Sequence, residues 1–168
     1  MAMIYGLATV TIGGEPRAVL VRGEQYLPLS HWGEDRSLPA LLQDWATVAA
    51  GLTQWSADEG AFASAGNFAE ADVQAPYRPG QVFCTGANYK KHVVGLIMGD
   101  PSTRTAEHEN LSPEELKARV EAMMDQRAKA LPFVFLKLPS CVVGPRDDVI
   151  LPKNVAKPDL ALELGVVI

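Results

Sequence analysis

The first residues suited to catalysis lie in the segment Asn88 to His92, which directly follows a short apolar run and a glycine. A loop or helix start at such a point can aim a side chain into a cleft, and histidine serves as a base near neutral pH. We therefore take His92 as a candidate general base. The alternative is a half-buried histidine bonded to the backbone, and for His31 and His108 we expect such a structural role.

Lys137 is a second candidate, because it ends the apolar run 132–136 and precedes a small-residue turn at Ser140. A lysine at a strand end can hold a substrate carboxylate as a point charge. The alternative for Lys137 is a solvated strand terminus.

Two acids, Asp159 and Glu163, stand in the last apolar segment of the sequence. Strand alternation would place positions 159, 161 and 163 on one face, and carboxylates in such a row bind hard divalent cations. The middle position is Ala161, so the row is incomplete. A charge at Glu163 among apolar neighbours is costly unless it is paired or metal-bound, which makes Glu163 the candidate metal ligand.

The first half of the sequence predicts short strands followed by a helix. Residues 7–12, 17–22 and 25–29 read as strands, and Gly13-Gly14 is a hairpin turn that lacks the rest of a dinucleotide fingerprint. Residues 37–54 carry an apolar stripe at helical spacing, which includes Trp45. The Pro- and Gly-containing segment 75–80 indicates a boundary near residue 75.

The second half predicts a strand at 81–85, a polar loop at 99–111 and a helix that begins at Ser112. Ser112, Pro113 and Glu115 form the signature of a capping box, and the apolar stripe continues to about Leu131. Further strands are expected at 133–136, 142–143, 149–151 and 160–168.

The composition excludes several classes of protein. The chain has 168 residues, of which 48% are hydrophobic and 21% charged, as in a globular protein. Its net charge of −5 argues against nucleic-acid or polybasic membrane partners, and no apolar run is long enough to span a membrane. Without a signal peptide, we expect a cytoplasmic protein in which Cys84 and Cys141 are buried free thiols.

Taken in order, these pieces resemble the fumarylacetoacetate hydrolase family over about residues 80–168. The likeness rests on spaced motifs that begin at Gly86, Pro132, Val149 and Asp159, the last of which runs to Ile168. The resemblance implies an α+β fold with a small N-terminal α/β domain at 1–75. An incomplete mixed β-roll catalytic domain would follow at 76–168, with a helical lid segment at 99–131.

The resemblance also implies a chemistry. Members cleave carbon–carbon bonds in acylpyruvates and related diketo acids, often in aromatic catabolism, or decarboxylate, hydrate or isomerise 2-oxo acids. On this likeness His92 activates a water, Lys137 fixes the charged end of the substrate, and Asn88, Tyr89 and Ser140 line the pocket. Mg²⁺ or Mn²⁺ would be the cofactor, with Glu163 among its ligands.

Three departures from the family pattern bear on activity. Alanine stands at 161 in place of the first glutamate of a Glu-x-Glu pair, and Gly95 replaces an acid that orients the histidine. The third carboxylate of the family is expected beyond Ile168, so we expect this chain alone to be a poor hydrolase. The alternatives are a non-catalytic member that acts by binding or assembly and a split enzyme completed by a second chain. The resemblance also implies a homodimer.

Overall fold

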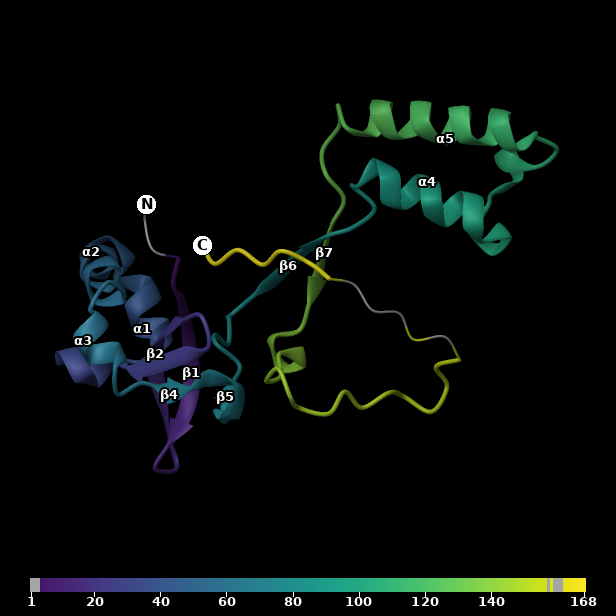
Figure 1. Ribbon diagram of the computed structural model, residues 1–168. Helices are drawn as coiled ribbons and strands as arrows, with labels where there is room; N and C mark the ends of the chain where they lie inside the picture. Colours follow the sequence, from purple (N-terminus) through teal and green to yellow (C-terminus); the bar gives the residue numbers. More distant parts are fainter. Residues whose placement is uncertain (1–3, 157, 159–161) are drawn as a thin grey trace. The chain divides into compact units, whose positions relative to one another are not determined.

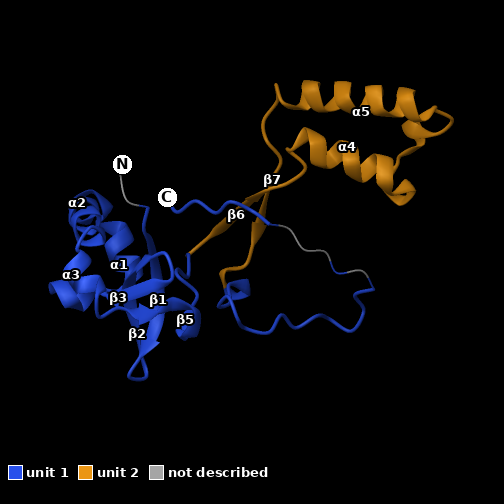
Figure 2. Ribbon diagram, viewed as in Figure 1, with its two compact units in different colours: residues 1–79, 140–168 blue, residues 80–139 orange. Residues whose placement is uncertain are grey.

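The computed structural model describes residues 4–156, 158 and 162–168. The chain divides into two compact units: residues 1–79 together with 140–168, and residues 80–139 (Figure 2). Helices and strands are mixed in an α+β fold, and the division falls between Pro79 and Gly80, in the predicted connector. No helix in the described part of the chain is long and apolar enough to cross a membrane.

The first unit is built on an antiparallel five-stranded sheet (Figure 1). The spatial order is β4-β3-β2-β1-β5, and each neighbouring pair is antiparallel. The predicted turn between β1 and β2 is confirmed: Gly13 and Gly14 have φ of +62° and +85°, a conformation that glycine adopts without steric cost. The strands are β1 Gly6–Ile12, β2 Glu15–Arg22, β3 Gln25–Pro28, β4 Gly66–Asn67 and β5 Val73–Gln74.

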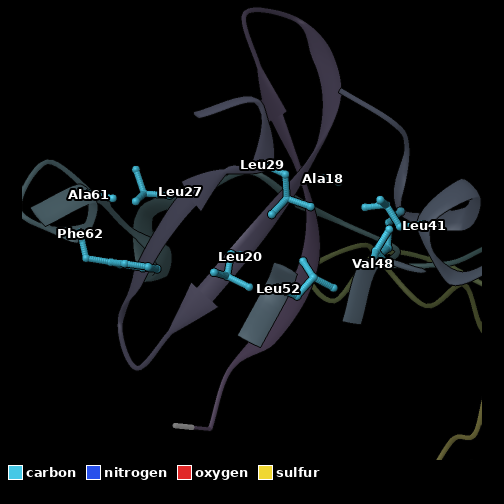
Figure 3. Close-up of a cluster of buried hydrophobic side chains, with 10 residues drawn as sticks. Ala18, Leu20, Leu27, Leu29, Leu41, Val48, Leu52, Ala61 and Phe62 are labelled. Carbon is cyan, nitrogen blue, oxygen red and sulfur yellow. The ribbon is translucent and has the colours of Figure 1, made fainter. Parts of the chain in front are cut away.

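Three helices bury their apolar sides against one face of this sheet (Figure 3). They are α1 Leu38–Gln43, α2 Trp45–Ser56 and α3 Glu59–Phe62. Strand alternation explains the contact, because Ala18 and Leu20 of β2 face the helices while Val19 faces the other side with Val10. Short 3₁₀ turns η1 Leu29–Trp32 and η2 Phe68–Glu70 complete the N-terminal part of this unit.

The single helix predicted at 37–54 is two helices in the structure. Asp44 lies between them with φ −112° and ψ 31°, outside the helical region. Its carboxylate accepts a hydrogen bond from Arg36 at 2.8 Å, and this contact, followed by one from Thr47, holds the pKa of Asp44 below its usual value. Because the break rotates the stripe, Trp45 is 45% exposed instead of buried.

The second unit contains a two-stranded ribbon and a helical hairpin. Strands β6 Val82–Thr85 and β7 Val134–Lys137 pair antiparallel, while α4 Lys90–Gly99 and α5 Pro113–Arg127 pack on each other. The predicted capping box is confirmed: the Ser112 Oγ accepts from the Glu115 N–H, and the Glu115 carboxylate accepts from the Ser112 N–H at 2.8 Å. The polar segment at 99–111 contains two 3₁₀ turns, η3 Pro101–Thr103 and η4 Ala106–His108.

After Lys137 the structure differs from several of the predictions made from the sequence. Pro139–Cys141 forms a 3₁₀ turn (η5), and Cys141 is exposed, so the prediction of a buried thiol is wrong there; both cysteines are free. In the described part of the chain, residues 142–143, 149–151 and 162–168 form no strand. A strand exists only with a hydrogen-bonding partner, and apolar composition does not supply one. Positions 160 and 161 lie outside the described residues.

Candidate functional site

The candidate base lies where the ribbon leads into the helical hairpin of the second unit. Gly86 follows β6 and donates a backbone hydrogen bond to the Phe133 carbonyl at 3.1 Å. The Asn88 amide reaches the same carbonyl at 3.4 Å, so the turn before α4 is tied to the residue before β7. Tyr89 caps α4, with its side chain 65% exposed, and His92 is the third residue of the helix. Asn88, Tyr89 and His92 therefore lie within five residues at the start of α4.

His92 faces away from the core of the hairpin because α4 is amphipathic. Val93 and Ile97 are 8% and 7% exposed, and they pack with Leu116, Val120 and Met124 of α5. His92 is exposed, which rules out the half-buried structural role for this histidine.

The other two histidines differ in their surroundings. His108 is buried, and its Nδ1 accepts a hydrogen bond from the Thr105 N–H at 3.2 Å, as expected for a structural residue. His31 is exposed and stacks edge-on against Trp32 in the first unit.

Lys137 lies at the far end of the ribbon from the candidate base. It ends β7 and pairs with Val82, whereas Val134 at the start of β7 pairs with Thr85, next to the turn that leads to α4. Three strand steps, or about 10 Å, therefore separate Lys137 from the His92 end of the ladder. The side chain is exposed, and its role in holding a carboxylate stays a prediction.

The remaining candidates belong to the other unit. Ser140 lies in the turn η5 and is exposed. Glu163 lies in irregular chain and is also exposed, so it does not bear the burial cost that made it a metal candidate. Asp159 and Ala161 lie outside the described residues.

The residues present do not fit a divalent metal site. Within residues 4–156, 158 and 162–168 there is no group of three or more histidine, cysteine, aspartate or glutamate side chains that could hold a metal ion. Magnesium requires near-octahedral oxygen ligands and is usually held by one or two carboxylates together with waters and substrate oxygens. Glu163 is exposed, and its neighbour in the expected pair is alanine.

Periodicity did not reveal a cluster of lysines on the hairpin. Lys90 and Lys91 of α4 and Lys117 of α5 line one groove together with Val94, Gly95 and Glu121. Lys91 and Lys117 lie 26 residues apart on two different helices, so no sequence spacing joins them. The available signal was the run from Tyr89 to Gly99, which contains two lysines and no acid.

Carboxylates next to the hairpin helices act as caps. The Asp100 carboxylate accepts from the Ser102 hydroxyl and N–H at 2.7 and 2.9 Å, and these bonds hold the pKa of Asp100 below its usual value. The pKa of Glu115 is likewise lowered, chiefly by the Ser112 N–H. Both acids are committed to local backbone structure and are therefore poor candidates for proton transfer.

Comparison of the sequence with known proteins identifies a family. The model of the fumarylacetoacetate (FAA) hydrolase C-terminal domain matches residues 81–168. A relative from Dictyostelium discoideum, a fumarylacetoacetate hydrolase domain-containing protein 2 homolog, is 28% identical over 96 residues. That match covers 57% of this chain and 22% of the relative, so the chain spans about a fifth of the protein it matches. No solved structure gives a significant match.

The matched region contains β6, α4, α5 and β7, and with them every candidate site residue. The chain belongs to the fumarylacetoacetate hydrolase family, which confirms the resemblance drawn from the motifs.

Proposed function

We propose that this chain carries the histidine-bearing part of an enzyme that hydrolyses a carbon–carbon bond in an acylpyruvate or related diketo acid. The observation that supports the proposal is the turn at the start of α4. There Asn88, Tyr89 and the exposed His92 lie within five residues at the start of a helix that packs on α5. The family match supports the same class of chemistry.

In this proposal His92 takes a proton from a water molecule, which then attacks the carbonyl distal to the carboxylate. Tyr89 and Asn88 lie three and four residues before His92, and they contact the oxo-acid through hydrogen bonds. Lys137 holds the charged end of the substrate. General-base catalysis of this kind contributes about 10² to 10⁴ in rate.

No step of this mechanism runs through a metal ion. The resemblance implies Mg²⁺ or Mn²⁺, but the described residues supply no ligand group for one. We propose that any metal bound with Glu163 takes its remaining ligands from outside the described residues, for example from another copy of this protein or from a complementing partner. The exposed β6–β7 ribbon favours a partner, since Phe83 and Leu136 are 66% and 68% exposed and an isolated two-stranded ribbon is only marginally stable.

Identification of products tests the proposed reaction. The purified chain is incubated with acetylpyruvate and Mg²⁺ or Mn²⁺, and the products are followed by proton NMR. Hydrolysis gives acetate and pyruvate, whereas decarboxylation, hydration or isomerisation would each give a different set of signals. Because this chain alone is expected to be a poor hydrolase, we expect slow formation of acetate and pyruvate by the wild type and none above background by His92→Ala.

The matched control is His31→Ala, because His31 is also an exposed histidine but lies in the other unit. It should retain the wild-type rate. If His92→Ala forms acetate and pyruvate as fast as the wild type, the assignment of the base is wrong.

The second candidate function is ligand binding without catalysis. It is favoured by glycine at 95 and alanine at 161, the positions where acids are expected, and by the lack of a metal-ligand group among the described residues. In that case oxalate, a mimic of the oxo-acid, should stabilise the wild type against heat but not His92→Ala, while neither protein turns over acetylpyruvate. Turnover by the wild type would exclude this candidate.

A further inference from the structure

The helical hairpin of the second unit contains a groove that the proposed reaction does not use. The groove lies between α4 and α5, which run side by side (Figure 1), and it has a volume of about 450 Å³. Its lining consists of Lys90, Lys91, Val94, Gly95, Lys117 and Glu121. A volume of this order is typical of sites for small molecules.

Positive charge exceeds negative charge along this groove. Lys90 is paired with Asp125 at 2.7 Å, and Lys117 reaches Glu121 only at 4.0 Å, with both of the latter side chains well exposed. Among the described residues Lys91 forms no ion pair. Three lysine ammonium groups thus lie near two carboxylates, those of Asp125 and Glu121. Within the described part of the chain the charge of Lys91 is uncompensated, and the charge of Lys117 is only weakly compensated by Glu121.

Gly95 keeps the groove open. A Cβ atom added at this position would meet no other atom within 4 Å, so the space beside Gly95 is open. Val94 supplies an apolar wall.

We propose that this groove binds a small organic anion through a carboxylate or phosphate group held by Lys91 and Lys117. Lysines act as point charges and do not distinguish the two groups by shape, unlike the planar fork of arginine. The size of the groove and the net charge of −5 favour a small ligand over a nucleic acid. The proposal is independent of the reaction assigned to His92, since that residue does not line the groove.

The test is an NMR titration of the full ¹⁵N-labelled chain with inorganic phosphate and, separately, with succinate. Sodium chloride at equal ionic strength is the reference for each. We expect saturable shifts of the Val94 and Gly95 amides with at least one of the two anions, and the comparison shows which group the groove prefers. Lys91→Ala should weaken binding about fivefold, the effect of one unit charge at contact distance in water, while Lys129→Ala, outside the groove, should not.

Gly95→Leu separates binding from folding. Leucine raises helix propensity relative to glycine, so the variant should be at least as stable as the wild type, yet its side chain fills the groove and should abolish binding. Gly99→Leu is the matched control, because Gly99 also lies in α4 with open space at its Cβ but does not line the groove. Shifts no larger than those with chloride, or binding that survives in Gly95→Leu, would overturn the proposal.

Discussion

The packing of α5 on α4 should determine how firmly His92 is held, and Leu116→Ala tests this. Leu116 is 3% exposed in a hairpin core with only four other buried side chains. Replacing a buried leucine by alanine costs about 3 kcal/mol, the lost transfer energy plus the cavity. Because the hairpin has its own core, we expect this loss to appear as local opening of α4 and α5 and not in the five-stranded sheet.

Amide hydrogen exchange measures the effect directly. A loss of about 3 kcal/mol corresponds to roughly 100-fold faster exchange of the protected amides of Val93 and Ile97. The amides of Val19 and Leu20 in β2 should exchange as in the wild type. Met123→Ala is the control on the same helix, since Met123 is 41% exposed and should change exchange little. Unchanged protection of α4 in Leu116→Ala would refute the idea that this core holds the helix of the candidate base.

Four further predictions concern global or local stability. Gly66→Ala should destabilise the first unit by about 1–3 kcal/mol in chemical denaturation, because its Cβ would lie 2.6 Å from the Tyr26 ring; Tyr26→Leu in the same chain should relieve the effect. Ser112→Ala removes the N-cap hydrogen bond of α5 and should lower the free energy of unfolding by about 1 kcal/mol in chemical denaturation. The pKa of Glu115 is lowered in the folded protein, so the ionised carboxylate stabilises the fold at pH values above the pKa of Glu115 in the unfolded chain. This stabilisation is lost as the pH falls through the pKa of Glu115 in the folded protein. Acid titration of the helical signal should therefore show less pH dependence in Glu115→Gln. Arg146→Ala removes hydrogen bonds to the Ala69 and Ala71 carbonyls at 2.6 and 2.9 Å, and limited proteolysis should then cut residues 140–150 faster than in the wild type.

Much of the fold could be predicted from sequence patterns that span only a few residues. The strand alternation of β2 and the glycine pair after β1 act within a few residues, and each has a direct physical reading. The capping box at Ser112 is likewise local, which is why the start of α5 could be placed to the residue.

Features that depend on distant partners could not be predicted in this way. The break occurs at Asp44, which contacts Arg36 eight residues earlier, and the apolar stripe reports neither the break nor the contact. Strands expected at 142–143 and 149–151 did not form, because an apolar run becomes a strand only beside another strand. The lysine groove needs two helices packed in register.

In the candidate site, too, contiguous features could be predicted from the sequence and features that join distant residues could not. The turn with Asn88, Tyr89 and His92 is contiguous, so its sequence already indicated it. The position of Lys137 at the opposite end of the β6–β7 ladder follows from the pairing of Val82 with Lys137, which joins residues 55 apart in sequence.

The most direct test of the central claim is the rate of acetylpyruvate cleavage by the wild type compared with His92→Ala, at saturating substrate in the presence of Mn²⁺. Loss of the enol absorbance gives the rate, and His31→Ala is measured in parallel. We predict that His92→Ala lowers kcat by about 10² or more while His31→Ala leaves it unchanged. Equal rates for the wild type and His92→Ala would contradict the assignment of His92 as the base.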